Sequence, residues 1–363
     1  MKQFRWGIFG TGAISAKFVA GLASATAARP EFIASRSAET ARRFATELGI
    51  PRAIEGYAEA AGQGGVDAIY VATPPSEHAA HAQLCLEAGI PVLVEKPFGS
   101  SDADASSIVQ TARDRSVFAM EAMWTRFLPA VQALRQKIAE GAIGRPRFVT
   151  GNFGTSQLPE ERNGMFDPAR GGGATLHLGA YPLSLGHLLF GTSTAVQATG
   201  TIGSTGVDED AAFQLRYASG VTGSFFVSLR SWAPDTFHVL GEHGMLAVEG
   251  SLVRPYGLTV TREEPLRWSS AQFGLRARLQ QHPFVHRLAQ MAGRSTRSRG
   301  RASAYHYRGN GYHYEADEVR RCVEAGRTES AVMPLDDSLA VARTMSRIRA
   351  DILSQDGLSK RNA

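Results

Sequence analysis

The length, composition and charge of the chain limit the classes of protein to which it can belong. Its 363 residues are 43% hydrophobic, with a mean hydropathy of −0.16, which is typical of a water-soluble protein with two domains. No stretch approaches the roughly 18 to 20 consecutive apolar residues that span a membrane, and the N-terminus has no signal-peptide pattern. We expect a cytoplasmic protein with Cys85 and Cys322 as reduced thiols, since their spacing does not suggest a metal site.

The net charge of +5 comes from one segment. Residues 265–314 contain nine arginines and no Asp or Glu, so the rest of the chain carries about −4. Within it, Arg294–Arg301 predicts a flexible basic loop in solvent, although an anionic substrate or a partner surface could also use it. Nucleic-acid binding is disfavoured, because no motif with interleaved aromatic residues accompanies the arginines.

The first predicted elements form a nucleotide-binding pattern. Trp6–Phe9 predicts a buried strand that leads into Gly10-Thr11-Gly12-Ala13-Ile14-Ser15 and then a helix, which is the Gly-x-Gly-x-x-Gly/Ala fingerprint in its required context. Gly10 would permit the tight turn, and Gly12 would let backbone amides approach a pyrophosphate at the helix N-terminus. The expected cofactor contacts in this turn are Gly10, Thr11, Gly12, Ala13 and Ile14.

The second strand, Phe32–Ala34, ends in a segment that bears on cofactor choice. An acidic residue at this distance from the glycine turn would hold the ribose hydroxyls of NAD, but this chain has Ser35-Arg36-Ser37. An arginine between two hydroxyls suits the 2′-phosphate of NADP. The sequence therefore favours NADP, with NAD possible, and the alternative is that Arg36 only caps the next helix.

Strands and helices then alternate, which predicts right-handed crossovers and a parallel, doubly wound sheet. The helices are expected at 38–48 and 77–88, and the strands at 66–72, 92–94 and 118–121. Because ligands bind beyond the carboxyl ends of such strands, the nicotinamide half of the cofactor is expected at Ala72, Thr73, Pro74, Glu95, Lys96 and Pro97. His78 and His81 are expected on a helix surface, with His78 touching the ligand.

The second half of the chain predicts an α+β domain. A helix at 129–140, a strand from Arg147 and an apolar helix after Gly171-Gly172-Gly173 precede a series of alternating strands, which favours an antiparallel sheet. These strands are expected at 195–202, 210–217, 221–229, 236–241 and 244–249, and closing helices at 312–325 and 336–354. We expect an N-terminal Rossmann domain at 1–123 and a C-terminal α+β domain at 124–363 whose open-faced sheet pairs in a homodimer or homotetramer.

His177 and Tyr181 are the chemical candidates in the second half. They are four residues apart, and hence neighbours on one helix face, and the three glycines would let that face approach a ligand. An ammonium group nearby would favour the ionised form of a phenol, so that Tyr181 could exchange protons nearer neutrality. The alternative is that both side chains simply pack beneath the sheet.

Taken in order, these motifs resemble the Gfo/Idh/MocA oxidoreductase family over essentially the full length, and within it the dihydrodiol dehydrogenase, xylose dehydrogenase and glucose–fructose oxidoreductase branch. Besides the segments above, the matching runs are Glu121 to Phe127, Gly309 to Glu315 and Met333-Pro334-Leu335. The resemblance implies Lys96 and Tyr181 as the catalytic pair, Trp124 and Arg126 as cofactor contacts, and no metal.

The resemblance also implies NADP-dependent hydride transfer at a carbinol carbon of a sugar, polyol or cyclic diol, without nucleic-acid or membrane partners. The family usually has Asp where this chain has His177, which would position a substrate hydroxyl without a negative charge, or clamp an anion if protonated. Two alternatives remain open: an NADP-binding sensor or scaffold without turnover, and redox-assisted glycoside cleavage with a retained nicotinamide.

Overall fold

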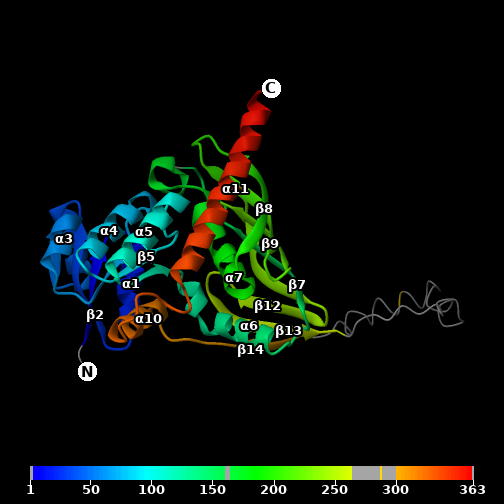
Figure 1. Ribbon diagram of the computed structural model, residues 1–363, viewed down its shortest axis with the longest axis horizontal. Helices are drawn as coiled ribbons and strands as arrows, with labels where there is room; N and C mark the ends of the chain where they lie inside the picture. The colour runs from blue at the N-terminus through cyan, green and yellow to red at the C-terminus, as the bar shows by residue number, and fades with distance from the viewer. Residues whose placement is uncertain (1–2, 160–163, 264–286, 288–299, 362–363) are drawn as a thin grey trace, which may run out of the picture.

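Two sheets organise the molecule. The computed structural model describes residues 3–159, 164–263, 287 and 300–361. In Figure 1, one sheet with its helices forms the half that contains the N-terminus, and the other forms the half that contains α7 and α11. Most of the arginine-rich segment 265–314, including most of Arg294–Arg301, lies outside the described residues.

The first sheet is parallel, and its six strands have the order β3-β2-β1-β4-β5-β6. Since the order reverses between β1 and β4, the loops after these strands diverge and leave a crevice at their carboxyl ends. Strands β4, β5 and β6 are buried along their whole length because helices cover both faces of the sheet. Their bounds are β1 (Phe4–Phe9), β2 (Ala28–Ser35), β3 (Arg52–Glu55), β4 (Ala68–Val71), β5 (Val92–Glu95) and β6 (Ala119–Ala122).

Five helices connect and cover these strands, which confirms the predicted Rossmann architecture. They are α1 (Ala13–Leu22), α2 (Ala38–Leu48), α3 (Tyr57–Gln63), α4 (His78–Glu87) and α5 (Asp102–Arg115). Strand β3 and helices α3 and α5 were not predicted from the sequence. Strand β3 is an edge strand of four residues with only Ile54 buried, and α5 buries small residues behind a polar face, so both have weak hydrophobic patterns.

The second sheet has eight strands in the order β14-β13-β12-β11-β7-β10-β9-β8. All of its strand pairs are antiparallel except β10 with β7, so the prediction of a mostly antiparallel sheet is confirmed. The bounds are β7 (Pro146–Gly154), β8 (Ser193–Ile202), β9 (Asp208–Tyr217), β10 (Thr222–Ser228), β11 (Ala233–Gly241), β12 (Gly244–Gly250), β13 (Pro255–Arg262) and β14 (Arg301–Ala304).

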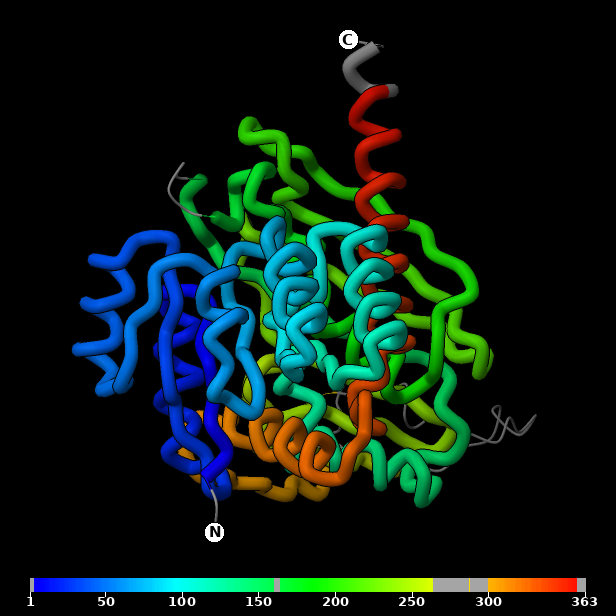
Figure 2. Tube along the Cα trace, turned by 60° about the vertical axis from the view of Figure 1, so that its left-hand side comes forward, coloured from blue at the N-terminus to red at the C-terminus, as the bar shows by residue number. Residues whose placement is uncertain are grey.

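Helices lie on one face of this sheet, and α11 runs across it in Figure 2. In the described part of the chain the opposite face is open over Gln197 and Gln214. The covering helices are α6 (Pro129–Ala139), α7 (Ala180–Phe190) and α11 (Leu335–Arg361). Successive strand residues point to opposite faces, so Val149, Val239 and Leu246 are buried in the core while their chain neighbours face outward. The predicted open-faced sheet is therefore present.

The chain returns to its first half near the end. Helix α10 (His313–Glu324) contacts the nucleotide-binding half, where the Thr26 amide donates to Asp317 Oδ1 at 2.8 Å and Asn310 Nδ2 donates to the Lys17 carbonyl at 2.7 Å. The proposed division between 1–123 and 124–363 stays a prediction, because the second part thus contributes to the surroundings of the first.

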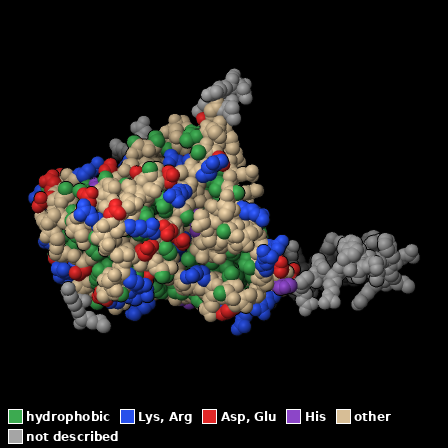
Figure 3. Space-filling model, in the orientation of Figure 1, with side chains coloured by type: hydrophobic (Ala, Val, Ile, Leu, Met, Phe, Trp, Pro, Cys, Tyr) green, Lys and Arg blue, Asp and Glu red, His purple; other side chains and the backbone are tan. Residues whose placement is uncertain are grey.

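The surface carries both signs of charge. On the face shown in Figure 3, lysines and arginines are interspersed with aspartates and glutamates rather than gathered into one patch. No helix in the described part of the chain is long and apolar enough to cross a membrane.

Candidate active site

The glycine turn joins β1 to α1 as its fingerprint predicts. Gly10 has a φ of +103°, and a Cβ there would lie 2.6 Å from the Ala72 carbonyl oxygen, so only glycine lets β1 and β4 approach this closely. Gly12 precedes α1 without any side-chain cap, and no atom lies within 4 Å of the place where its Cβ would be. The free amides of Ala13 and Ile14 thus begin a helix beside open space, which fits a pyrophosphate.

The segment after β2 has the form expected for an adenosine phosphate. Ser35 is buried at the end of the strand, and Ser37 caps α2 by accepting from the Thr40 amide at 3.4 Å. Because Ser37 supplies the cap, the alternative role for Arg36 is not needed. The Arg36 side chain is exposed and makes no hydrogen bond or ion pair with the described residues, so its guanidinium is available to a ligand.

A cavity of about 560 Å³ opens between the two halves of the molecule, beyond the ends of β4 and β5. Eight of the predicted site residues, from segments far apart in the sequence, line this cavity. The predicted residues in its wall are Ile14, Thr73, His78, Glu95, Lys96, Trp124, His177 and Tyr181. This volume suits a small ligand and the reactive end of a cofactor.

Lys96 is the central cation of this cavity. It directly follows β5, and its Nζ donates to the carbonyl oxygen of His177 at 3.1 Å. The same ammonium lies 5.0 Å from the centre of the Tyr181 ring. The end of one strand in the first sheet is thereby joined to the helix that carries Tyr181 in the second half.

His177 lies in a short π-helix, Thr175–Gly179, that leads into α7. A π-turn changes the register of the side chains, and such turns are frequent at functional sites. His177 Nε2 is buried without a hydrogen-bond partner among the described residues. Burial, together with the charge of Lys96, lowers the pKa of His177 to about 3, so the imidazole is neutral and does not clamp an anion at neutral pH.

The three glycines before this helix serve packing rather than a ligand, which corrects the expectation. A Cβ on Gly171 would lie 2.9 Å from Pro75 Cβ, and one on Gly172 would meet the Met165 carbonyl at 2.7 Å. Gly173, with a φ of +126°, would collide with the Asp208 carboxylate. Asp208 Oδ2 instead accepts from the Thr175 amide at 2.7 Å and so fixes the start of the π-helix.

Glu95 lines the cavity, but its carboxylate is held by protein groups. The Tyr70 hydroxyl donates to Oε1, and the Lys96 amide donates to Oε2 at 3.0 Å. Glu315 of α10 is fully buried nearby, and neither of its carboxyl oxygens has a hydrogen-bond partner in the described part of the chain. Burial raises the pKa of both carboxyl groups, which favours their protonated forms.

His78 and His81 are buried, so the prediction that they lie on a helix surface is wrong. Helix α4 begins at His78, at the edge of the sheet, and its first turn therefore faces the loops after β4 and β5. The His78 ring nitrogens lie 2.8 Å from the carbonyl oxygens of Pro97 and Thr73. His81 Nδ1 lies 2.9 Å from the Thr73 hydroxyl. These contacts fix the two loops that carry Thr73 and Lys96.

Arg126 is a structural residue, and its assignment as a cofactor contact is corrected. The side chain is fully buried outside the cavity. It donates to Asp337 Oδ2 at 2.6 Å, to Ser184 Oγ at 2.7 Å and to the Val332 carbonyl at 3.1 Å. These bonds tie the 3₁₀-helix Trp124–Phe127 to α7 and α11 and hold the guanidinium away from the cavity.

Several residues of the cavity wall had no predicted role. Tyr312 stacks on Trp124, with ring centres 4.8 Å apart and planes 9° apart, and the Arg254 guanidinium lies 5.5 Å from the Trp124 ring centre. Tyr312 belongs to one of the family-like runs, whereas Arg254 follows no motif. The other unassigned lining residues are Lys17, Pro75, Phe153, Met165, Ser251 and Val253.

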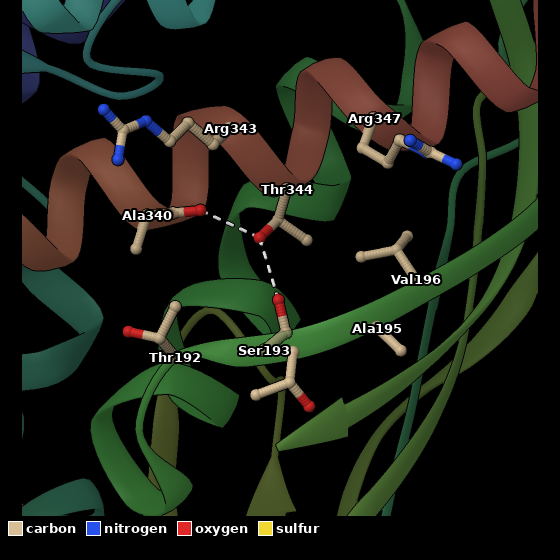
Figure 4. Close-up of a pocket in the computed structure, with 9 residues that line it drawn as sticks. Thr192, Ser193, Ala195, Val196, Ala340, Arg343, Thr344 and Arg347 are labelled. Atoms are coloured by element: carbon tan, nitrogen blue, oxygen red, sulfur yellow. Dashed lines mark hydrogen bonds between the residues drawn. The ribbon is translucent and has the colours of Figure 1, made fainter. Parts of the chain in front are cut away.

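A second hollow of about 460 Å³ lies between α11 and β8, away from the glycine turn (Figure 4). Two of its hydroxyl groups are hydrogen-bonded to each other, since Ser193 Oγ lies 3.1 Å from Thr344 Oγ1. Thr344 Oγ1 also donates to the Ala340 carbonyl. Figure 4 shows the side chains of Arg343 and Arg347 extending in opposite directions along the helix. They do not converge on a common ligand, so the hollow is a packing groove.

The described residues contain no group of three or more His, Cys, Asp or Glu side chains placed to hold a metal ion. Both Cys85 and Cys322 are buried and free. Burial raises the pKa of each thiol, which leaves them unreactive.

A Rossmann sheet with a glycine turn, together with a cavity at its switch point lined by Lys, His and Tyr, defines a nucleotide-dependent oxidoreductase. Family comparison agrees: the model "Oxidoreductase family, NAD-binding Rossmann fold" matches residues 4–123, and "GFO/IDH/MocA C-terminal domain" matches residues 131–247. The chain belongs to the GFO/IDH/MocA oxidoreductase family.

Relatives of known activity are similar over nearly the whole chain. The trans-1,2-dihydrobenzene-1,2-diol dehydrogenase of Mus musculus is 33% identical over 354 residues, and that of Bos taurus is 34% identical over 352 residues. In both comparisons the alignment covers 96% of this chain and 96% of the relative. These similarities confirm the predicted family and the predicted class of enzyme, a dehydrogenase or reductase.

Solved structures share the fold at lower identity. A levoglucosan dehydrogenase in complex with NADH and levoglucosan has a TM-score of 0.81 at 19% identity, covering 97% of this chain and 98% of the other. An aldose-aldose oxidoreductase from Caulobacter crescentus has a TM-score of 0.79 at 20% identity and 98% coverage of both chains. A 3-ketoreductase from Actinomadura kijaniata in complex with NADP and TDP-benzene has a TM-score of 0.77 at 22% identity, with 97% and 98% coverage. At these identities the likeness is one of fold.

Proposed function

We propose that the protein is an NADP-dependent oxidoreductase that transfers a hydride between the nicotinamide and a carbinol carbon, with Lys96 and Tyr181 as the catalytic pair. The observation that carries this proposal is the convergence of Lys96, Tyr181 and His177 in one cavity at the carboxyl ends of the nucleotide-binding strands. Such a cavity is where α/β folds bind their ligands.

The cofactor would be held by the turn Gly10 to Ile14, by Ser35 to Ser37, and by the loops of Ala72 to Pro74 and Glu95 to Pro97. The open space over Gly12 fits its phosphates. When bound, the nicotinamide supplies the acceptor or donor of hydride. Arg36 supports NADP, because its guanidinium is exposed and has no partner among the described side chains. Relatives of this fold have been solved with NADH and with NADP.

The protein residues handle the proton and the orientation of the substrate. Tyr181 exchanges the proton of the reacting hydroxyl, and Lys96 polarises the substrate oxygen. The Lys96 ammonium is fixed for this role by the His177 carbonyl at 3.1 Å. The unpaired Nε2 of His177 is free to exchange a hydrogen bond with a neighbouring substrate hydroxyl.

The substrate class follows from the relatives. Those named for their activity act on a dihydrodiol, and the fold neighbours include enzymes named for levoglucosan and aldoses. We infer a sugar, polyol or cyclic diol as substrate. The buried free thiols of Cys85 and Cys322 suit a reducing cytoplasm, where we place the reaction.

The test is direct binding followed by turnover. Calorimetry with NADPH and NADP should give a single site per chain, and the loaded protein should interconvert NADP and NADPH with members of a panel of sugars, polyols, diols and their carbonyl forms. Failure to bind either nucleotide would refute the proposal. Tight binding without turnover across the panel would favour the sensor or scaffold instead.

A further inference from the structure

The cavity wall has an excess of positive charge. Three cationic side chains line it, Lys17, Lys96 and Arg254, and one acidic side chain, Glu95. Glu95 already accepts from the Tyr70 hydroxyl and the Lys96 amide, and burial raises its pKa. The cavity therefore presents two or more uncompensated cations, which favours an anionic occupant beyond what a carbinol requires.

The three cations belong to different parts of the site. Lys17 lies on α1, one turn beyond the glycine turn, so its charge is near the expected phosphates of the cofactor. Lys96 is engaged by the His177 carbonyl and lies over Tyr181. Arg254 comes from the loop between β12 and β13 in the second sheet, so its charge is left for the substrate.

The loop that carries Arg254 is rigidly held. The Leu252 amide donates to Asp235 Oδ1 at 2.6 Å, and Thr125 Oγ1 donates to the Val253 carbonyl at 3.0 Å. The Arg254 amide itself donates to Ser251 Oγ at 3.3 Å. Two of these bonds come from other elements, β11 and the 3₁₀-helix Trp124–Phe127, and the third lies within the loop. Together they fix the backbone that leads to the arginine, which lowers the entropic cost of presenting its guanidinium to the cavity.

The guanidinium of Arg254 lies over an aromatic ring but is not paired with an acid in the described part of the chain. It lies 5.5 Å from the centre of the Trp124 ring, and Trp124 stacks in turn on Tyr312. A cation–π contact of this kind does not use up the N–H groups of the guanidinium, which stay available to a ligand. The described part of the chain offers that edge no carboxylate: Arg254 has no side-chain hydrogen bond or ion pair there. This is the arrangement that binds a carboxylate or phosphate with two parallel hydrogen bonds.

We infer that the substrate of the proposed oxidoreductase carries an anionic group, a carboxylate or a phosphate, and that Arg254 binds that group while Lys96 and Tyr181 bind the reacting hydroxyl. The substrate is thus a hydroxylated acid of sugar size rather than a neutral sugar. This inference rests on the proposed function. Arg254 is a specificity residue, whereas the chemical step stays with Lys96 and Tyr181.

The experiment compares matched acidic and neutral compounds. kcat/KM is measured with NADP for gluconate, glucose 6-phosphate and glucose, and for the corresponding uronates and aldoses, in the wild type and in Arg254→Gln, Arg254→Lys and Arg343→Gln. Arg343 is an exposed arginine of α11 far from the cavity, so its variant controls for net charge. NADPH affinity is measured for each protein by calorimetry.

We expect the wild type to prefer an acid, and Arg254→Gln to lower kcat/KM for that acid by at least about tenfold, as for a lost charge-assisted hydrogen bond. The neutral compounds, NADPH binding and Arg343→Gln should change by less than about threefold, and Arg254→Lys should recover part of the loss. A larger loss of kcat/KM for gluconate identifies the group as a carboxylate, and a larger loss for glucose 6-phosphate identifies it as a phosphate.

An equal loss for acids and neutral compounds, or a parallel loss of NADPH affinity, would overturn the inference, because Arg254 would then serve the fold or the cofactor. If no compound is turned over, the proposed function fails by itself. The inference is then decided by calorimetry of gluconate and glucose 6-phosphate with NADPH-loaded protein: binding that Arg254→Gln abolishes supports it, and absence of binding overturns it.

Discussion

Lys96 shows how one side chain joins the two halves of the site. Its backbone amide donates to Glu95, its Nζ donates to the His177 carbonyl, and its charge lies over the Tyr181 ring. The contact with Tyr181 is made to the ring face, so replacing the tyrosine by phenylalanine preserves it. The hydroxyl can therefore be removed with little effect on the packing of the cavity.

Tyr181→Phe and Lys96→Ala should each lower kcat by about 10² or more, because a positioned proton-transfer group contributes about that factor. The dissociation constant of NADPH should change little in Tyr181→Phe. Steady-state kinetics and fluorescence titration measure the two quantities, with Tyr256→Phe, an exposed tyrosine of β13, as the control. Full activity in Tyr181→Phe would assign the acid–base role to another group, with His177 tested next.

Arg36→Asp should move cofactor preference toward NAD by at least tenfold, roughly 1.4 kcal/mol, because the change removes a partner of the 2′-phosphate and adds a repulsive charge. The dissociation constants of NADPH and NADH are compared by calorimetry. Arg42→Asp, in the helix that follows Arg36, controls for the change in net charge. An unchanged ratio would show that another residue recognises the phosphate.

The neutral state of His177 predicts a flat pH dependence of substrate binding. Its pKa, about 3, lies below the ordinary value of 6.5 because of burial and Lys96. Protonation is thus disfavoured in the folded protein, and no charge is gained or lost between pH 5.5 and 8. Affinity for an acid such as gluconate, measured by calorimetry on NADPH-loaded protein, should be constant over this range. An increase on acidification near pH 6.5 would contradict the assignment and restore the anion clamp.

At the scale of elements, α10 and β5 meet through buried acid groups. Glu315 in the first turn of α10 and Glu95 at the end of β5 are both buried. The Tyr70 hydroxyl donates a hydrogen bond to Glu95 but not to Glu315. The hydrogen bonds from Tyr70 and from the Lys96 amide compensate Glu95 in part, whereas Glu315 has none in the described ranges. Because burial raises the pKa of Glu315, we expect the stability of this contact to depend on pH.

Glu315→Gln should stabilise the protein, and increasingly so as the pH rises. Burial holds the pKa of Glu315 well above its ordinary 4.5, so the folded state keeps a proton that the unfolded state releases. The free energy of unfolding of the wild type must fall as the pH rises above about 4.5, and the glutamine variant lacks this loss. We expect a gain of at least about 1 kcal/mol on going from pH 5 to pH 8.

Urea unfolding at several pH values measures this difference. Glu87→Gln, an exposed residue of α4, is the matched control and should follow the wild type. If the curves for Glu315→Gln and wild type stay parallel from pH 5 to pH 8, Glu315 ionises normally in the folded protein and the proton is held elsewhere.

At the scale of the molecule, the bare face of the eight-stranded sheet carries an apolar row. Leu240 is paired with Phe148 of β7 and with Met245 of β12 in the strand register. Their chain neighbours Val149 and Val239 point into the core, so these three side chains point outward. A row of this kind on an uncovered sheet face favours association with a second copy.

We expect the protein to form a dimer or tetramer through this face. Leu240→Lys should lower the molar mass measured by light scattering while leaving the circular dichroism spectrum unchanged. Leu353→Lys, which alters an exposed leucine of α11, is the matched control and should keep the wild-type mass. A wild-type protein that is monomeric at micromolar concentration would refute the expectation.

Local patterns in the sequence were sufficient for much of the fold. The strand–turn–helix context of Gly10 and Gly12, the strand that ends at Glu95, and the alternating strands of the second half depend on neighbours within a few residues. Motif order then indicated the family, which the comparisons confirmed. Short or weakly patterned elements such as β3 and α5 were not predicted, because their burial depends on neighbouring elements rather than on their own residues.

The tertiary structure alone decided the environment of individual side chains. Arg126 is bonded to Ser184 and Asp337, which follow it by 58 and 211 residues. Arg254, in the loop between β12 and β13, lies over the ring of Trp124. The sequence could place Arg126 in a motif and gave no signal for Arg254. Partners so distant leave no local pattern, because burial and charge pairing are set only when the chain packs. The sequence therefore determined which chemistry the chain carries, and packing determined which of those residues face the cavity.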